Sequence, residues 1–391
     1  MANNGEKPFE FRVPATIHAG VGSHERVSAE AARVGAGNVL VVTDANVRAT
    51  SMAAKVIEQL SQAGLLRGVF SDIPGEPTTT EVEQGLTILR KARADTLVAV
   101  GGGSVIDTAK AVAVMATNDG VIADYLGAGK VKKPKLPLVV VNTTAGTGSE
   151  VTRFAIITDP ATSVKMLIAD PHLIPEVAID DPLLTVTCSP LVTASTGLDA
   201  LTHAIEAYIS VRATALSDVL ALSAIAKVGQ SLRAAFRNGK DLAARTLMHV
   251  ASLEAGMAFS NASVALVHGM ARPIGAYFHA AHGISNAVLL PHVMAWSMSE
   301  AWGRFADIAR ALGVATAGLT EKQAAERAVA EVRSLCQDLQ IPGLTGLGID
   351  PEKLMALAPT MAKDALASGS PGNNPRLPTV EEIVDLYRKA L

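Results

Sequence analysis

The first half of this 391-residue chain alternates short β-branched, apolar runs with segments of helical periodicity. Regular alternation of this kind indicates βα units, which bury a mostly parallel sheet between layers of helices. Two further runs, 154–158 and 165–169, flank Asp159-Pro160 and indicate a hairpin. The predicted strands are 9–17, 38–43, 66–70, 96–100 and 136–142, and the predicted helices are 52–63, 80–93 and 105–116.

After Pro190 the strand-like alternation stops, and the remaining pattern is helical. Pro- and Asp-rich punctuation near 180–190 marks the change. We therefore expect an α/β domain over 1–187 and an all-α domain over 188–391. The predicted helices of the second domain are 190–209, 216–236, 240–259, 300–312, 320–338, 351–366 and 379–390.

Composition narrows the class of protein. Apolar residues make up 49% of the chain and aromatic residues 4%, which favours a tightly packed globular enzyme over a disordered chain. A net charge of −3 argues against binding to nucleic acid or to an anionic membrane. The two cysteines are far apart, and neither a signal peptide nor an apolar run of transmembrane length is evident. We expect a soluble, cytoplasmic protein with a small-molecule substrate.

The segment Ser195–Tyr208 (STGLDALTHAIEAY) carries the first candidate site. Asp199 and His203 stand four residues apart, so on a helix both side chains lie on one face. Two further histidines, His268 and His282, each precede a glycine. One carboxylate and three imidazoles form a ligand set suited to Fe²⁺ or Zn²⁺. A simple hydrogen bond between Asp199 and His203 is the structural alternative.

Two glycine-containing loops follow predicted strands. Gly101-Gly102-Gly103-Ser104 opens a helix, where free backbone amides and the helix dipole favour a phosphate. Ser104 and Asp107 there have the spacing of a capping box. A second loop runs from Thr143 to Ser149 (TTAGTGS). Because nucleotides bind at the carboxyl ends of strands in open α/β sheets, the two loops together indicate a nucleotide site, although the G-x-G-x-x-G fingerprint is missing.

Asp44 ends another predicted strand. A carboxylate at this place can accept a hydrogen bond from a ribose hydroxyl and would repel a 2′-phosphate, which favours NAD over NADP. Capping of the following helix is an equally good explanation.

The sequence resembles the iron-containing (group III) alcohol dehydrogenase family over essentially its whole length. The matching stretches are GGGSVIDTAKA (101–111), TTAGTGSEVTRFAIITD (143–159), KMLIADPHLIPEVAIDDPLLT (165–185), STGLDALTHAIEAYIS (195–210), GMAFSNASVALVHGMA (256–271) and AHGISNAVLLPHV (281–293).

This resemblance implies a Rossmann-like, dinucleotide-binding domain, a helical metal domain and an active site in the cleft between them. It also implies NAD-dependent hydride transfer between a metal-bound alkoxide and nicotinamide, with iron as the metal. The metal ligands would be Asp199, His203, His268 and His282. The cofactor contacts would be Asp44, Gly102, Gly103, Ser104, Thr143, Thr144, Thr147 and Lys165.

One position departs from the pattern of the family. Relatives with an HGMAHP motif carry a histidine where this chain has Arg272, and arginine cannot relay protons near neutral pH. His279 could replace it in a polar role or simply line the cleft. Arg272 itself could bind an anionic substrate, form a structural salt bridge or contact the cofactor phosphates.

Two other functions remain open at this point. Dehydroquinate synthase, a lyase, shares this general architecture and uses NAD with a metal. A structural or filament-forming subunit would bind the nucleotide without turnover. The ligand set accepts zinc as well as iron. The family also suggests a homodimer joined through the first strand.

Overall fold

The computed structural model describes residues 8–161 and 164–391. Its contacts divide the chain into two compact units, Arg12–Cys188 and Ser189–Leu391, the second including the described residues before Arg12. The sequence placed this boundary between residues 187 and 188.

The unit Arg12–Cys188 contains a six-stranded, wholly parallel sheet in the order β1-β9-β6-β4-β2-β3. A three-stranded sheet, β5-β8-β7, lies beside it in the same unit. The strands are β1 (Thr16–Ala19), β2 (Val39–Val42), β3 (Leu66–Phe70), β4 (Thr96–Gly101), β5 (Gly127–Ala128), β6 (Leu138–Asn142), β7 (Phe154–Asp159), β8 (Val164–Ala169) and β9 (Val177–Asp180). The helices are α1 (Val27–Arg33), α2 (Ala45–Arg48), α3 (Ser51–Gln62), α4 (Thr79–Ala92) and α5 (Gly103–Met115).

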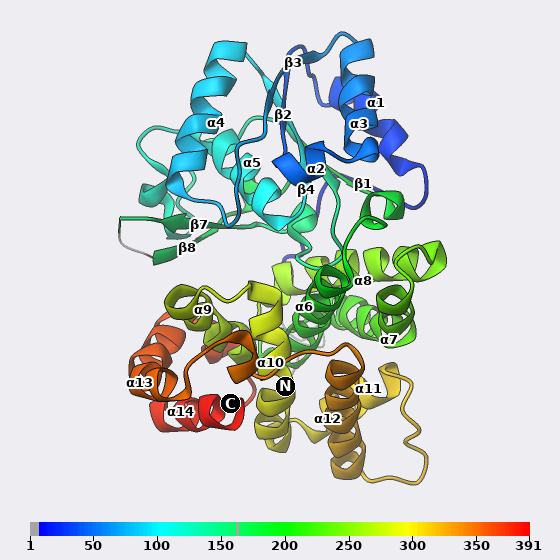
Figure 1. Ribbon diagram of the computed structural model, residues 1–391, viewed down its shortest axis with the longest axis vertical. Helices are drawn as coiled ribbons and strands as arrows, with labels where there is room; N and C mark the ends of the chain where they lie inside the picture. Colours follow the sequence, from blue (N-terminus) through cyan, green and yellow to red (C-terminus); the bar gives the residue numbers. More distant parts are fainter. Residues whose placement is uncertain (1–7, 162–163) are drawn as a thin grey trace. The chain divides into compact units, whose positions relative to one another are not determined.

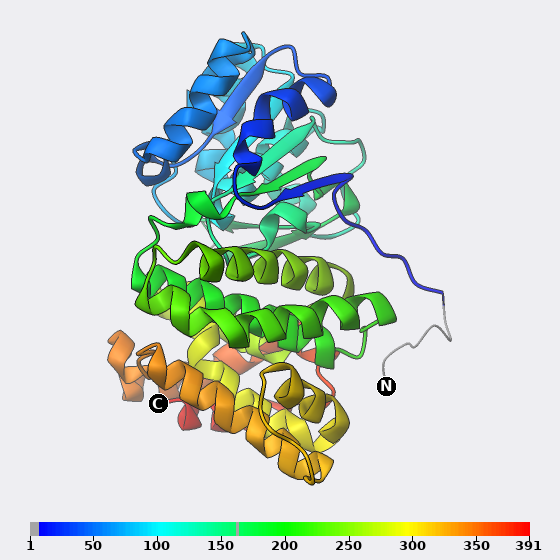
Figure 2. The ribbon, with the colours of Figure 1, turned by 90° about the vertical axis from the view of Figure 1, so that its right-hand side faces the viewer.

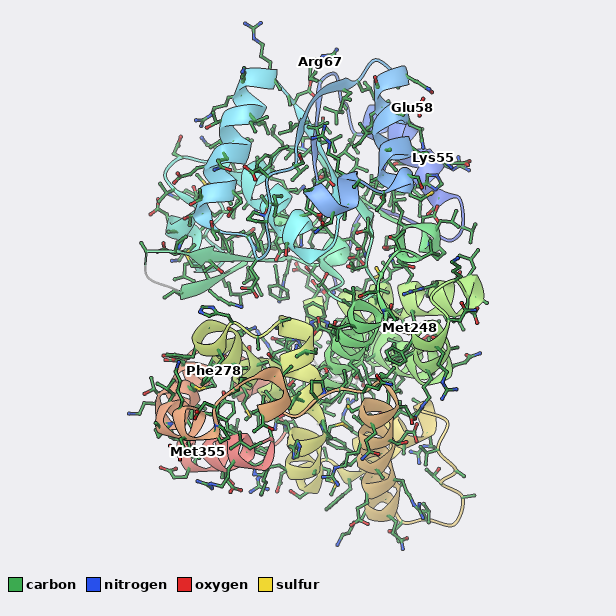
Figure 3. The ribbon with its side chains drawn as sticks, in the orientation of Figure 1. Lys55, Glu58, Arg67, Met248, Phe278 and Met355 are labelled. Carbon is green, nitrogen blue, oxygen red and sulfur yellow. The ribbon has the colours of Figure 1, made fainter. Side chains whose placement is uncertain are left out.

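Helices cover both faces of the large sheet, so the central strands are buried throughout and mostly apolar (Figure 1). Leu40 and Val42 of β2 point to the core under α4 and α5, whereas Val39 and Val41 point to the core under α1 and α3. Helix α3 shows the matching pattern: its buried side chains face the sheet, and the charged groups of Lys55 and Glu58 point outward (Figure 3).

The unit Ser189–Leu391 is helical throughout its described secondary structure (Figure 2). Its longest helices, α6, α7 and α8, pack against one another. The helices are α6 (Pro190–Ile209), α7 (Ala215–Arg237), α8 (Leu242–Ala262), α9 (Leu266–Phe278), α10 (His282–Ser297), α11 (Trp302–Ala311), α12 (Glu321–Asp338), α13 (Pro351–Ala367) and α14 (Val380–Lys389).

Among the described residues, α7 is long and apolar enough to cross a membrane by length and composition alone, and the bent pair α8 and α9 passes the same test. Core helices of soluble proteins pass it too. Lys227 of α7 is paired with Glu254 of α8 at 2.8 Å, and Arg233 is paired with Glu331 of α12 at 2.8 Å. These ion pairs and the packing against α6 place α7 within the bundle.

The α/β plan and the helical second half are confirmed, but several elements differ from the prediction. Strands β5 and β9 and helices α1 and α2 were not predicted. The strand expected over 9–17 is wrong in extent, because regular pairing starts only at Thr16, opposite Val177 of β9. Pro14 just before it has no N–H to donate to a ladder. Helices α9 and α10 were not predicted, since Gly and Pro residues such as Pro273 and Pro291 interrupt their helical pattern. The predicted hairpin forms as the antiparallel pair β7–β8.

Candidate metal and cofactor sites

Helix α6 presents three buried ionisable side chains on one face. Asp199, His203 and Glu206 follow one another at spacings of four and three residues, so they lie along a single stripe. Ser189 caps the start of the helix by accepting a hydrogen bond from the Val192 amide, and Pro190 occupies the first turn, where no N–H is needed. The sequence thereby fixes where this stripe begins.

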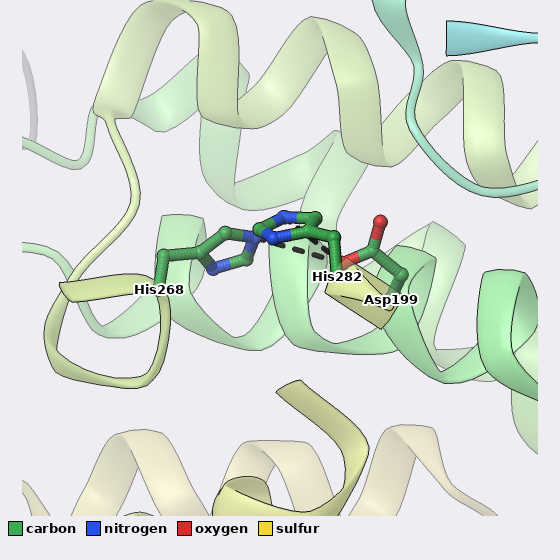
Figure 4. A group of neighbouring side chains, drawn as sticks. All are labelled: Asp199, His268 and His282. Atoms are coloured by element: carbon green, nitrogen blue, oxygen red, sulfur yellow. Dashed lines mark ion pairs between the residues drawn. The ribbon is translucent and has the colours of Figure 1, made fainter. Parts of the chain in front are cut away.

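Asp199 meets one histidine from each of two other helices. Its Oδ1 lies 3.6 Å from Nε2 of His268 in the first turn of α9 and 3.9 Å from Nε2 of His282 at the start of α10. The three ligand atoms all lie within 4.8 Å of one another (Figure 4). One carboxylate oxygen and two imidazole nitrogens therefore point at a common position, as a divalent metal requires.

His203 lies beside this group but is not one of its three members. Its ring stacks on the ring of His268, with centroids 4.5 Å apart, and on that of Phe259, with centroids 4.1 Å apart. The structure therefore brings all four predicted ligands into one cluster and places only three of their donor atoms at ligand spacing. A ligand role for His203 stays a prediction.

Glu206, which the sequence analysis did not single out, orients His268. Its Oε2 is 2.6 Å from Nδ1 of His268, and its two oxygens also accept hydrogen bonds from the amides of Ala265 and Val267. Because Nδ1 is engaged, Nε2 is the nitrogen whose lone pair faces Asp199. The i+7 spacing from Asp199 on α6 was a signal that could have identified Glu206.

Asn286 is the second residue that sequence reasoning missed. It is 0% exposed, and its Nδ2 lies 2.7 Å from Oδ1 of Asp199, 3.1 Å from Nε2 of His268 and 3.2 Å from Nε2 of His282. Its own Oδ1 is buried, and none of the described residues bonds it. An amide N–H₂ group can face these three atoms only if they are presented as acceptors. Its i+4 spacing from His282 on α10 carried a weak signal.

The electrostatics also suit a cation. Burial alone would raise the pKa of Asp199, but His203, His282 and His268 together hold it well below its usual value. The carboxylate is therefore ionised at neutral pH, and the oxygen and nitrogen donors fit Fe²⁺. We conclude that the residues present fit a divalent metal ion.

Each of the two histidines precedes a glycine that allows a close approach. A Cβ on Gly283 would lie 2.6 Å from the carbonyl oxygen of Ser195 in α6, and one on Gly269 would lie 2.7 Å from Cγ of Pro371. Only glycine lets α10 approach α6 closely enough to bring His282 to Asp199.

Arg272 and His279 have different surroundings. Arg272 lies one turn after His268 and donates through Nη1 to Oγ of Ser370 at 2.9 Å. Among the described residues, no carboxylate lies within 4.0 Å of the Arg272 guanidinium. The structural salt bridge that the sequence left open for Arg272 is therefore wrong for the described residues. The buried Nε of Arg272 also has no described hydrogen-bond partner. Burial lowers the pKa of Arg272, while Glu206 opposes this shift. His279 is exposed and ends α9 with a positive φ of 55°, outside the group of three.

In the unit Arg12–Cys188, most predicted cofactor contacts lie at the carboxyl ends of three central strands of the large sheet. Strand β4 is followed by Gly102, Gly103 and Ser104, strand β6 by Thr143, Thr144 and Thr147, and strand β2 by Asp44. These three parallel strands are neighbours in the sheet. A Cβ on Gly102 would lie 3.0 Å from Cγ2 of Thr144, and one on Gly103 2.8 Å from Cγ2 of Thr147. The two loops are therefore in contact with each other.

The capping box predicted for Ser104 and Asp107 is wrong. Helix α5 starts at Gly103, its N-cap is Gly102, and no described side chain caps it. Asp107 turns away from the helix start and accepts hydrogen bonds from the Ser149 hydroxyl at 2.6 Å and the Ile156 amide at 2.9 Å. The amides of the first turn thus keep their capacity to bind an anion.

Two predicted contacts have protein partners. Oδ1 of Asp44 caps α2 by accepting from the amides of Asn46 and Val47, and the described bonds leave its Oδ2 unused. Lys165 belongs to β8 in the smaller sheet and pairs with Glu76 at 2.7 Å. Their contacts with a cofactor stay predictions.

Comparisons with known proteins cover nearly the whole chain. Residues 14–182 match the family described as iron-containing alcohol dehydrogenase, and residues 193–391 match the C-terminal domain of the Fe-containing alcohol dehydrogenase family. The NAD-dependent methanol dehydrogenase of Bacillus methanolicus is 38% identical over 382 residues, which is 97% of this chain and 99% of that protein.

Solved structures agree in fold. The crystal structure of a 1,3-propanediol oxidoreductase superposes with a TM-score of 0.95 at 38% identity, covering 98% of this chain and 100% of that one. The sulfoacetaldehyde reductase of Bifidobacterium kashiwanohense, solved with NAD⁺, has a TM-score of 0.88 at 29% identity, covering 98% of this chain and 99% of that one.

Proposed function

The chain belongs to the iron-containing alcohol dehydrogenase family, and from this premise we propose that the cluster around Asp199 holds its iron. The protein is an NAD-dependent oxidoreductase that interconverts an alcohol and the corresponding aldehyde or ketone. The observation that carries the site assignment is the convergence of Asp199, His268 and His282 from three helices. His203 completes the proposed ligand set from its stacked position.

The residues of the chain then have distinct tasks. When bound, iron supplies a Lewis acid for the substrate oxygen, and NAD supplies the hydride acceptor. Asp199 provides the negative charge of the ligand set, and Glu206 fixes the tautomer and the ring orientation of His268. Burial of Asp199 and His268 limits the access of water to the ligands. Neither Ser149 nor Cys188 needs to act as a nucleophile.

We propose that NAD binds at the sheet edge formed by the two loops. The uncapped first turn of α5 would bind the pyrophosphate, the threonines after β6 would contact it from the other side, and Oδ2 of Asp44 would accept a ribose hydroxyl. Lys165 would contribute from β8 if it exchanges Glu76 for the cofactor.

Replacing Asp44 tests the cofactor preference. Asp44→Ser keeps a capping oxygen but removes the negative charge, so we expect the preference for NADH over NADPH, measured as the ratio of kcat/KM values, to fall at least about tenfold. Asp72→Ser is a matched control, because Asp72 occupies the same place after β3 and is exposed. An unchanged ratio in Asp44→Ser would rule out the ribose contact.

The activity itself is tested with metal-stripped protein reloaded anaerobically with Fe²⁺ or with Zn²⁺. We expect NADH oxidation by short aldehydes to return with iron, and comparison with zinc then establishes which metal supports turnover. Absence of turnover with either metal, despite measurable NADH binding, would favour the lyase or the non-catalytic subunit instead.

The surroundings of Arg272 favour an anionic substrate for this alcohol dehydrogenase. The Arg272 guanidinium, one turn from His268, has no described carboxylate partner, and a bidentate site for a carboxylate, sulfonate or phosphonate would satisfy it. The similarity to a protein named sulfoacetaldehyde reductase, whose named substrate is an aldehyde with a sulfonate group, supports this class.

Kinetics of Arg272→His and Arg272→Gln separate the possibilities for this residue. If Arg272 binds the anionic group, kcat/KM should fall at least about 30-fold for an anionic aldehyde and change less than about threefold for a neutral aldehyde of similar length. Equal losses on both aldehydes would exclude the anionic-substrate role and favour a structural or cofactor role. His279→Ala, from the exposed end of α9, serves as the control and should affect neither.

We also propose that the enzyme is cytoplasmic and forms a homodimer through β1. In the described sheet β1 is an edge strand that pairs with β9, so its other edge offers backbone groups to a second copy. Light scattering in solution would give the mass, and a monomer or an open filament would contradict the proposal.

A further inference from the structure

A buried lysine lies beneath the two loops of the unit Arg12–Cys188. Lys110 of α5 is 0% exposed, and its Nζ donates to Oγ of Ser149 at 3.0 Å, to the carbonyl oxygens of Thr152 at 2.9 Å and Phe154 at 2.8 Å, and to Oγ1 of Thr152 at 3.1 Å. These four acceptors belong to Ser149, the last residue of the loop Thr143–Ser149, and to the short segment that follows it. One ammonium group therefore gathers this segment around the second turn of α5.

Asp107, one helical turn before Lys110, binds the same segment. Its Oδ1 accepts the Ser149 hydroxyl at 2.6 Å, and its Oδ2 accepts the Ile156 amide at 2.9 Å. The Ser149 hydroxyl thus accepts from Lys110 and donates its one proton to Asp107. The three N–H groups of Lys110 share four acceptors, and Asp107 accepts two further hydrogen bonds, so the pair links α5 to the segment 149–156 at six positions.

The positions of these groups distinguish the pair from ligands. Lys110 lies two turns inside α5, fully buried, so it does not reach a cofactor at the start of the helix. The loop that Lys110 anchors lies closer to the helix start. Its Thr144 and Thr147 side chains pack against Gly102 and Gly103, the first residues of the helix start. The contacts of Lys110 and the candidate phosphate site therefore lie at opposite ends of one continuous set of contacts.

Stability alone does not explain this choice of residues. Burial lowers the pKa of Lys110 to about 8, which Asp107 and Glu150 oppose, and it raises the pKa of Asp107. Buried charged groups commonly add no stability over apolar residues of similar volume, but they do define one arrangement of the groups that they bind. A site that must place two loops against one pyrophosphate needs such a defined arrangement.

We propose that Lys110 and Asp107 are positioning residues for NAD, which hold the Thr143–Ser149 loop against the first turn of α5 so that both loops bind the same pyrophosphate. This inference rests on the proposed cofactor site.

The test compares Lys110→Met with Lys135→Met. Lys135 is another buried lysine of the same unit, paired with Glu176 at 2.6 Å, and its partner lies outside the loops. We expect Lys110→Met to weaken the NADH Kd, measured by fluorescence, at least about tenfold and to raise the KM for NADH similarly. The kcat at saturating NADH and the iron content should change less than about twofold. Lys135→Met should leave the NADH Kd unchanged.

A milder variant covers the case in which Lys110→Met does not fold. Ser149→Ala removes only the hydroxyl shared by Lys110 and Asp107, and we expect it to weaken NADH binding about threefold or more without loss of iron. Wild-type NADH affinity in either folded variant, or an equal loss in Lys135→Met, would overturn the inference. If the wild-type protein itself binds no NADH, the proposed cofactor site fails first.

Discussion

Replacing Asp199 by Asn should reduce the affinity for iron by more than about 100-fold and remove measurable alcohol dehydrogenase activity. Asp199 is the one carboxylate in the group of three ligand atoms, and the change removes its charge while keeping its shape. The loss of an outer residue that merely orients a ligand already costs about 10–100-fold in metal affinity, so the loss of a charged ligand should exceed this range. Iron affinity is measured by competition with a chelator.

The control for this change is Glu254→Gln in the same helical unit. Glu254 forms a partly exposed ion pair with Lys227 of α7, and such pairs contribute only about 0.2–1 kcal/mol to stability. We expect iron affinity and turnover of this variant to match those of the wild type. Wild-type iron affinity in Asp199→Asn would contradict the assignment of the metal site, whatever its effect on activity.

Gly283→Ala should destabilise the protein by about 1–3 kcal/mol and weaken iron binding at the same time. The added Cβ would lie 2.6 Å from the carbonyl oxygen of Ser195, a backbone atom that no change of side-chain rotamer can move. Helix α10 must therefore shift away from α6, and His282, the neighbouring residue, must shift away from Asp199 with it. Denaturant unfolding and chelator competition measure the two effects.

Gly303→Ala is the matched control for the glycine. This residue lies in the first turn of α11, where an added Cβ would meet only the end of the Glu321 side chain at 3.4 Å. Because alanine has the higher helix propensity, we expect equal or greater stability and unchanged iron binding. If Gly283→Ala loses stability but keeps full iron affinity, the close helix contact does not control the position of His282.

The sequence was sufficient for the features that depend on local spacing. The buried strands β2, β4 and β6 and the Asp199–His203 spacing follow from periodicities within one element, and the hairpin follows from two such runs on either side of a turn. Glu206 could have been added by the same reasoning, since it continues the stripe on α6. The resemblance to a family then supplied His268 and His282, which spacing alone could not join to the pair.

The remaining features depend on contacts between distant segments. The extent of β1 is set by its register with β9, about 160 residues later, which no local pattern encodes. Asp107 has the spacing of a capping residue. Its carboxylate instead accepts hydrogen bonds from Ser149 and Ile156, which lie far along the chain. The role of Asn286 could not be predicted from local spacing, because its contacts with Asp199 and His268 join three helices.

The three converging side chains that we propose as metal ligands belong to Ser189–Leu391, whereas the predicted cofactor contacts belong to Arg12–Cys188. Mutational changes can therefore alter either property separately. If these assignments hold, substitutions in the loops after β2, β4 and β6 should change the choice of dinucleotide without altering a proposed iron ligand. Substitutions around α9 and α10, which carry Arg272 and two of the proposed ligands, should change the substrate while these loops stay intact. Directed evolution of this enzyme could therefore use two separate libraries, one in Arg12–Cys188 for the choice of dinucleotide and one in Ser189–Leu391 for the substrate.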